Sequence, residues 1–176
     1  MKNKSVAVFV EKMYEDIELW YPYYRMKEEG ARVTLIGPEK NETYTGKHGM
    51  KAQSDISIDE AKTSDYDLLI VPGGYSPDFM RRNKKMVRFV KDMHEQGKHV
   101  AAICHGAWML ASADILKNKK VTSFFSIQDD LKHAGAQWVD QSFVSDNRIL
   151  TSRFPQDLPD FCRGIIEAAT RQPAGV

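Results

Sequence analysis

The sequence predicts an α/β protein in which helices cover both faces of a mostly parallel sheet. Four short apolar segments have the composition of fully buried strands: Ser5–Val10, Arg32–Ile36, Asp67–Val71 and His99–Ile103. Helical patterns follow most of these strands along the chain. Neighbouring parallel strands need such crossover helices, so the alternation predicts a sheet between two helical layers.

The first half of the chain contains one long helix and a polar insertion. Asp16–Glu29 carries apolar residues at roughly helical spacing, and Gly30 is placed to end that helix. Residues 41–57 are polar and contain glycine, which favours a short hairpin. Ile58–Lys62 then has the pattern of one helical turn, with Ser57 before it as a capping residue.

The second half contains four further helices and an antiparallel pair of strands. Gly97 and Gly135 are placed to end two of the helices. Phe143–Ser145 and Ile149–Thr151 pair around the turn Asp146-Asn147. The expected helices are Lys84–Gln96, Gly106–Ala113, Ile127–Ala134 and Leu158–Ala169.

Length and composition fit one cytoplasmic domain. The chain has 176 residues, a net charge of +1 and two cysteines. We therefore expect a single domain over residues 1–171 and a frayed tail over residues 172–176. Two cysteines do not make a disulfide framework, which favours a reducing cytoplasm. The apolar run Val6–Val10 is too short for a signal sequence or a membrane span, and no basic stripe indicates a nucleic-acid partner.

The segment around Cys104 has the layout of a nucleophile elbow. The apolar run Val100–Ile103 stops at Cys104, and His105, Gly106 and a helix-like segment follow. A tight turn between a strand and a helix exposes one side chain at the sheet edge. The free N–H groups and positive dipole end of the helix favour the thiolate, which is the reactive form of cysteine.

A structural interpretation of Cys104 stays open on this segment alone, because cysteine after a core strand is usually packing. Cys162 serves as a comparison. It lies in an amphipathic helical stretch without a glycine turn or a neighbouring histidine, and we interpret it as a core residue. Ligands bind at the carboxyl ends of parallel strands, where residues 11–18, Gly73-Gly74 and Cys104 converge. That convergence favours a catalytic interpretation of Cys104.

Motifs spread over nearly the whole chain carry a family resemblance. They are residues 14–19 with Tyr21-Pro22, residues 45–49, Val71–Gly74, Ala102–Gly106, Thr122–Phe124, Asp129-Asp130, residues 135–140 and Thr151–Arg153. Together they resemble the ThiJ/PfpI family of the class I glutamine-amidotransferase-like superfamily, and its PfpI branch most. The resemblance implies a flavodoxin-like, doubly wound sheet. It also implies an activity, because the PfpI branch is described as intracellular peptidases and the wider group as glyoxalases or deglycases.

The resemblance implies roles for four residues. Cys104 is the nucleophile, and Glu15 is the acid that reaches its sulfur. Beside a thiolate Glu15 must keep a proton, because like charges repel; the alternative is that Glu15 caps the following helix. In the PfpI branch the elbow histidine, here His105, is oriented by an acid of a neighbouring subunit, and Asp78 takes that position. Asp78 is alternatively a first-turn acid after Pro77, and its contact with His105 would require a homodimer or homohexamer.

Four further positions are assigned to substrate by the same resemblance. Gly74, with the amide of His105, resembles the oxyanion hole of the family, and Gly73 allows a close approach. Phe124 stands where many relatives carry tyrosine, so a substrate-binding hydroxyl is missing. Arg153 either binds an anionic product or forms a surface ion pair. No histidine has metal-ligand spacing, and we expect neither a metal nor a cofactor.

Three functions follow from these assignments. The first is a cofactor-independent conversion of methylglyoxal or glyoxal, and of their early glycation adducts, to hydroxy acids, in the manner of a glyoxalase III or deglycase in stress protection. The second is peptide hydrolysis through an acyl-enzyme at Cys104, which needs His105 turned and held by a partner. The third is oxidation sensing or chaperone-like protection with an oxidised Cys104. Conversion of a small carbonyl does not require His105 to protonate an amine leaving group, whereas peptide hydrolysis does. The first function therefore ranks highest. A true glutamine amidotransferase is disfavoured because the chain has no His-x-Glu sequence.

Overall fold

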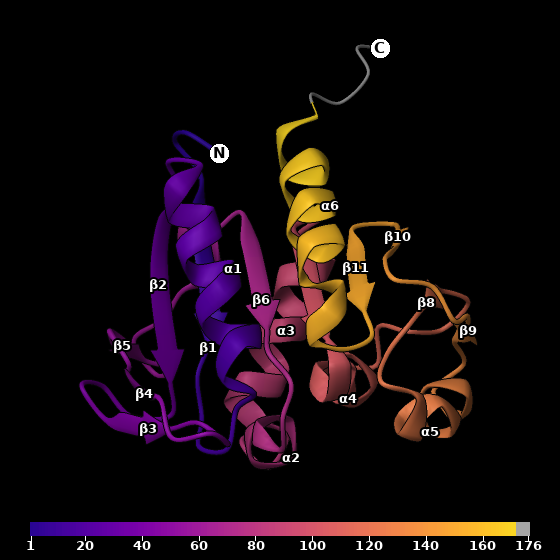
Figure 1. Cartoon of the computed structure of the whole chain (residues 1–176), viewed down its shortest axis with the longest axis horizontal. Helices are drawn as coiled ribbons and strands as arrows, with labels where there is room; N and C mark the ends of the chain where they lie inside the picture. Colours follow the sequence, from indigo (N-terminus) through magenta and orange to yellow (C-terminus); the bar gives the residue numbers. More distant parts are fainter. Residues whose placement is uncertain (172–176) are drawn as a thin grey trace.

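The centre of the protein is a seven-stranded sheet with the strand order β10-β11-β7-β6-β1-β2-β5 (Figure 1). The computed structural model describes residues 1–171, and the tail expected to fray at 172–176 lies outside the described residues. Neighbouring strands pair in parallel except β10 and β11, so the prediction of a mostly parallel sheet is confirmed. The strands are β1 (Ser5–Phe9), β2 (Arg32–Gly37), β5 (Ile56–Ser57), β6 (Leu68–Val71), β7 (His99–Ile103), β10 (Val144–Asp146) and β11 (Ile149–Ser152).

Helices cover both faces of this sheet, which gives the flavodoxin-like, doubly wound arrangement (Figure 1). The first and last helices, α1 and α6, pack against each other on one face, and α2, α3 and α4 cover the other. Within residues 1–171, no helix combines the length and the apolar character needed to cross a membrane. The helices are α1 (Asp16–Glu28), α2 (Ser76–Met80), α3 (Lys84–Glu95), α4 (Ala107–Ser112), α5 (Gln128–His133) and α6 (Leu158–Thr170).

Short elements complete the chain between these helices and strands. Two small sheets lie outside the central one: an antiparallel hairpin and a parallel pair. Four single turns of 3-10 helix link the longer elements, and one of them carries the elbow cysteine. These elements are β3 (Thr43–Thr45), β4 (Lys51–Gln53), β8 (Lys120–Val121), β9 (Gln137–Trp138), η1 (Thr63–Asp65), η2 (Cys104–Gly106), η3 (Phe125–Ile127) and η4 (Pro155–Asp157).

Each central strand supplies alternate side chains to two separate cores. In β1, Ala7 and Phe9 belong to the core under α3 and α4, whereas Val6 and Val8 belong to the core under α1 and α6. All four side chains are fully buried. Because both faces are covered, the central strands are apolar throughout rather than alternating with polar residues.

Two short segments test the prediction of local helical structure. The single turn expected after Ser57 is present: the Ala61 N–H donates to the Ser57 carbonyl oxygen at 3.2 Å, and Ser57 Oγ accepts a hydrogen bond from the Glu60 N–H. A single turn gains too few hydrogen bonds to offset the ordering of its backbone, so it does not extend into a longer helix. The sequence analysis gave no bounds for the helix Ser76–Met80, because five residues are too few to show a helical period, although it allowed Asp78 as a first-turn acid there.

The carboxyl ends of β1, β6 and β7 meet at one edge of the sheet. The chain winds outward in opposite directions from β1 and from β6, so the sheet reverses its order between them. Such a switch point is where α/β sheets bind ligands. The predicted convergence of the segment after β1, Gly73-Gly74 and Cys104 is therefore present at this edge.

Replacing Ile70 by alanine should destabilise the protein by about 2–5 kcal/mol, because its fully buried side chain fills the centre of β6. Ile17→Ala is the matched control. The Ile17 side chain is 48% exposed, so its loss should change the free energy of unfolding by no more than about 0.5 kcal/mol. Urea unfolding measures both variants, and equal losses would contradict this assignment of the core.

Candidate active site

Cys104 lies at a strained elbow between β7 and α4. Its φ is +60°, a left-handed value that costs a residue with a side chain about 1–2 kcal/mol. Glycine makes the elbow fit against the neighbouring turn. A Cβ at Gly106 would lie 2.5 Å from the Val71 carbonyl oxygen, and a Cβ at Gly73 would lie 2.6 Å from the Cβ of Cys104. The predicted succession of strand, tight turn and helix is present.

The acid beside Cys104 is Glu18, from the first turn of α1. Glu18 is fully buried, and its Oε2 accepts a hydrogen bond of 2.8 Å from the Gly73 N–H. A Cβ at Gly73 would lie 2.5 Å from that oxygen, so the three segments that follow β1, β6 and β7 meet at this glycine. Within the described residues Glu18 Oε1 is buried and has no hydrogen-bond partner.

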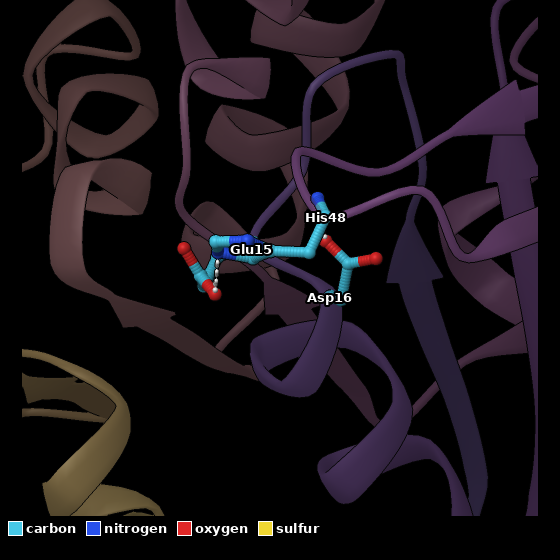
Figure 2. A group of neighbouring side chains, drawn as sticks. All are labelled: Glu15, Asp16 and His48. Atoms are coloured by element: carbon cyan, nitrogen blue, oxygen red, sulfur yellow. Dashed lines mark hydrogen bonds and ion pairs between the residues drawn. The ribbon is translucent and has the colours of Figure 1, made fainter.

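Glu15, the acid implied by the family resemblance, lies one helical turn away from Glu18. It also lines the cavity at the thiol, but its carboxylate pairs with His48 at 3.1 Å and with Lys47 at 3.4 Å (Figure 2). The prediction that Glu15 reaches the sulfur is therefore corrected to Glu18, which interacts with the Cys104 thiol. Residues three apart share a helix face, so the motif alone did not separate the two acids.

A signal for Glu18 was present in the sequence. Glu18, Pro22 and Met26 follow one another at intervals of four and occupy one face of α1. All three are buried. An acid on the apolar face of a predicted helix is unusual, because a buried carboxyl needs a partner or a proton.

Burial and mutual repulsion control the protons of this pair. Burial raises the pKa of the Glu18 carboxyl from 4.5 to about 8, and the Gly73 N–H offsets only part of that rise. Burial also raises the pKa of the Cys104 thiol; negative charge on Glu18 adds to the rise, and the N–H groups of His105 and Gly74 oppose it. Desolvation therefore outweighs the expected preference of the helix end for thiolate. Two touching negative charges are unfavourable, so the pair holds at most one of them near neutral pH.

Two backbone N–H groups converge on the sulfur. Those of Gly74 and His105 both lower the pKa of the Cys104 thiol by hydrogen bonding. Gly74 has φ +72°, and a Cβ there would lie 2.4 Å from the backbone nitrogen of Glu15, so only glycine fits. An oxygen on a carbon attacked by this sulfur would meet both donors, which is the geometry of an oxyanion hole.

His105 contacts the thiol and is held by neighbours of the same chain. Its Nδ1 lies 3.2 Å from Cys104 Sγ, and its Nε2 lies 3.3 Å from the Oγ of Ser126. The ring stacks on Phe124 with centroids 5.1 Å apart. Burial and the positive charge of Lys47 lower the pKa of His105 below 6.5, so the imidazole is neutral at pH 7 and has a nitrogen free to accept a proton.

Asp78 and Arg153, both predicted as site residues, lie outside the cavity of this chain. Asp78, in α2, forms an ion pair with Arg82. Its contribution to a neighbouring subunit stays a prediction. Arg153 pairs with Asp157 at 2.8 Å and with Asp140 at 2.7 Å, so the surface ion pair is correct and the product-binding role is not supported.

The thiol opens into a cavity of about 690 Å³ with an apolar rim. Met13, Tyr75 and Phe125 line it and expose 42–61% of their surface. Lys47 is the one lysine or arginine in its wall. The segment after β11 adds lining residues that the sequence analysis missed, because nothing in their local pattern points to the Cys104 edge. The lining is Met13, Glu15, Glu18, Lys47, Gly74, Tyr75, Cys104, His105, Phe124, Phe125, Phe154, Pro155 and Gln156.

A third acid of this region, Asp16, has a structural role. Asp16 is buried, and its two oxygens accept hydrogen bonds from the N–H groups of His48, at 2.8 Å, and Met50, at 2.7 Å. A Cβ at Gly46 would lie 2.7 Å from the same carboxylate. Glu15, Asp16 and His48 offer ligand atoms close enough together for a metal ion (Figure 2). The contacts of Asp16 show that it holds the β3–β4 loop, from which Lys47 reaches the cavity.

The family follows from comparison with known proteins. Residues 4–168 match the DJ-1/PfpI family. This chain belongs to the DJ-1/PfpI family. The residues matched include the elbow, both glycines of the turn after β6, and Glu15 and Glu18.

Several relatives carry the names of enzymes. "Deglycase PfpI" of Pyrococcus furiosus is 42% identical over 154 residues, which cover 88% of this chain and 92% of the relative. "Putative cysteine protease YraA" of Bacillus subtilis is 42% identical over 161 residues, which cover 92% and 95%. These names support an enzyme of this family.

Solved structures share the fold. A two-domain protein of Anabaena variabilis, with DJ-1/ThiJ/PfpI-like and ferritin-like domains, matches with a TM-score of 0.93 and 41% identity. The match covers 94% of this chain and 48% of that protein, so this chain spans about half its length. DJ-1beta of Drosophila melanogaster has a TM-score of 0.89 at 24% identity, covering 98% and 92%, and shows the fold alone.

The raised pKa of Glu18 should make stability depend on pH. Between pH 4.5 and about 8 the folded protein keeps a proton on this carboxyl that the unfolded chain has lost. Raising the pH through that interval should therefore lower the free energy of unfolding, by at most about 1.4 kcal/mol per pH unit. We propose measuring this in Cys104→Ala, where the coupled thiol is absent.

The control for this pH dependence is the double variant Cys104→Ala/Glu18→Gln, studied by urea unfolding over the same pH range. Subtracting its profile isolates the Glu18 carboxyl from every other titrating group. Identical profiles for the single and double variants would show that Glu18 has an ordinary pKa in the folded protein.

Proposed function

We propose that this protein is a cofactor-independent cysteine enzyme that converts methylglyoxal or glyoxal, and their early glycation adducts, to hydroxy acids. The observation that carries the proposal is the contact of Cys104 with a buried, proton-holding Glu18 at the wall of an open cavity. A thiol beside a protonated acid suits addition to a carbonyl, in which sulfur attacks carbon and the oxygen takes up a proton.

The chemistry uses the groups already described. The Cys104 sulfur attacks the aldehyde carbon of methylglyoxal, and the oxygen that becomes negative is stabilised by the N–H groups of Gly74 and His105. Glu18 or His105 then moves the hydrogen of that carbon, as a proton, to the neighbouring carbonyl carbon. This oxidises the first carbon to a thioester and reduces the second to an alcohol, so no external oxidant is needed. Water cleaves the thioester to give lactate and the free thiol.

The size of the cavity supports glycation adducts as further substrates. Its volume of about 690 Å³ exceeds what a three-carbon carbonyl occupies, and its rim is apolar. An adduct on an amine or thiol would place its carbonyl-derived carbon at Cys104 and the carrier along this rim. The name of the relative "Deglycase PfpI" also supports glycation adducts as substrates.

A second candidate is peptide hydrolysis, favoured by the distance of 3.2 Å between His105 Nδ1 and Cys104 Sγ. A nucleophile and base in contact are the minimum for acyl transfer. A peptide leaving group needs a proton from that histidine, which is neutral and within this chain contacts the Ser126 hydroxyl through Nε2. In this case a homo-oligomer would supply Asp78 from a second copy to His105.

Oxidation sensing draws less support from the geometry. Only 7% of the Cys104 surface is exposed, and burial raises the pKa of its thiol. Both features slow oxidation, which needs an accessible thiolate.

The first test is lactate formation from methylglyoxal without added cofactor. Wild type should turn over, Cys104→Ala should lose at least about a thousandfold, and Glu18→Gln should lose about 10²–10⁴-fold. Glu15→Gln should lose less than Glu18→Gln, because Glu15 does not contact the sulfur. Glu28→Gln, an exposed change at the end of the same helix, is the matched control and should retain full activity.

Three outcomes would contradict the proposal. Wild type without turnover would exclude the carbonyl activity, and turnover of a peptide alone would favour hydrolysis. A greater loss in Glu15→Gln than in Glu18→Gln would return the proton-transfer role to Glu15.

A further inference from the structure

A second cavity lies at the opposite end of β7 from the active site. Its volume is about 440 Å³, and its walls come from the amino ends of β1, β6 and β7, the β10–β11 turn and α6. His99, the first residue of β7, lines this cavity, whereas Cys104 follows the last residue of the same strand. The two cavities share no lining residue.

Positive charge is concentrated in these walls. Asp67 is the one carboxylate of the lining, and it already accepts the Ser5 N–H at 2.9 Å and pairs with Lys4 at 3.4 Å. Four cations against one carboxylate leave an excess of three positive charges, although the whole chain has a net charge of only +1. The cationic lining residues are Lys4, Lys98, Arg148 and Arg171.

Arg148 stands out among these cations. Lys98 donates a hydrogen bond to the Thr63 carbonyl, and Arg171 pairs with Glu167 at 3.6 Å. Arg148 forms neither an ion pair nor a side-chain hydrogen bond within residues 1–171, and it lines the cavity. A guanidinium presents five N–H donors in a fixed fork, which suits it to bind an oxyanion.

Another cation-lined cavity of the protein shows the contrast. Between α3 and η1, Lys85 pairs with Asp59 at 2.6 Å and Arg88 with Asp92 at 2.6 Å. The other two cations of that cavity, Lys62 and Lys84, form no ion pair within residues 1–171, so two acids face four cations there. The cavity at His99 has one acid for four cations, so its net positive charge is larger and acts on whatever enters it.

The backbone at Arg148 is also exceptional. β10 and β11 are joined by the two-residue turn Asn147-Arg148, whose φ values are +45° and +68°. This turn type takes glycine at its second position, because φ is positive there and glycine has no Cβ. Arginine holds that position at a cost in strain.

Apart from Asn and Asp, the residues with strain of this kind line the two cavities. Eight described residues other than glycine have positive φ, and five of them are Asn or Asp, which tolerate it. The remaining three are Met13, Cys104 and Arg148. Met13 and Cys104 line the active-site cavity, and Arg148 lines the basic cavity.

We propose that this basic cavity binds a small multivalent oxyanion of the phosphate class, with Arg148 as its principal ligand and Lys4 as a second one. Both groups flank the imidazole of His99, and their charges, together with burial, lower the pKa of that side chain. An anion bound between them would cancel those charges. His99 is therefore a reporter of occupancy inside the cavity itself.

The test is thermal unfolding and calorimetric titration of the whole protein with pyrophosphate, against sodium chloride at matched ionic strength. Pyrophosphate should raise the Tm of wild type and bind in the titration, and the pKa of His99, followed by proton NMR, should rise. Inorganic phosphate should act more weakly, because it carries less charge. A titration with ADP tests whether the cavity accepts an esterified diphosphate. Binding of pyrophosphate but not of ADP would indicate a free diphosphate as the ligand, and binding of both would indicate that an esterified diphosphate also fits. Either result supports the proposal.

Arg148→Gly is the decisive variant, because glycine is the residue that this turn prefers. The variant should fold with a Tm equal to or above that of wild type in chloride, and it should lose the response to pyrophosphate. Arg163→Gln is the matched control. It removes one positive charge from α6 at an exposed ion pair outside the cavity, and it should respond as wild type does.

A stabilisation by pyrophosphate no greater than that by chloride would overturn the proposal. So would a full pyrophosphate response in Arg148→Gly, or an unchanged pKa of His99 on binding. Because Cys104 plays no part in these measurements, the outcome is independent of the proposed carbonyl activity.

Discussion

The hydrogen bond from the Gly73 N–H to the buried Glu18 carboxylate is the contact on which the active-site edge depends. It joins the turn after β6 to the first turn of α1, and there is no room for a Cβ between that turn and the Cys104 elbow. Any side chain at Gly73 would separate the acid from the thiol. The strained φ of Cys104 persists because the surrounding close packing holds it.

Burial affects the pKa values of the two groups at this contact more than the positive end of the helix dipole does. Glu18 is fully buried, so its carboxyl keeps a proton at a pH where an exposed glutamate has lost it. Cys104 is subject to the same desolvation. The site therefore places a carboxyl that keeps its proton directly beside the thiol. The neutral His105 adds a proton acceptor at 3.2 Å from the sulfur.

Strand β7 connects two chemically different regions. Its carboxyl end delivers a thiol into an apolar-rimmed cavity, and its amino end places His99 in a cavity lined by four cations and one carboxylate. Five residues of extended chain separate the two ends by roughly 16 Å. At both ends a residue other than glycine or Asx holds a left-handed backbone conformation, Cys104 at one and Arg148 at the other. The sheet thus supports strained positions at its two edges, where the backbone leaves the regular ladder.

The prediction of the strands succeeded because burial on both faces requires continuous apolar runs, and four such runs are visible in the chain. The elbow was equally visible, since strand, cysteine and glycine-containing turn adjoin in sequence. The acid was misplaced by one turn, because the family motif contains both Glu15 and Glu18, and the spacing of Glu18 with Pro22 and Met26, which marks the buried face, was not used to choose between them.

The sequence by itself determined the layers, the elbow cysteine and the family, because these depend on local order and composition. Only the tertiary structure decided which side chains meet. Glu18 rather than Glu15 lies at the thiol. Arg153 forms ion pairs with two aspartates. Lys4, His99 and Arg148 line one basic cavity. Contacts between segments far apart in the chain depend on packing and on the reach of each side chain, which no local pattern encodes.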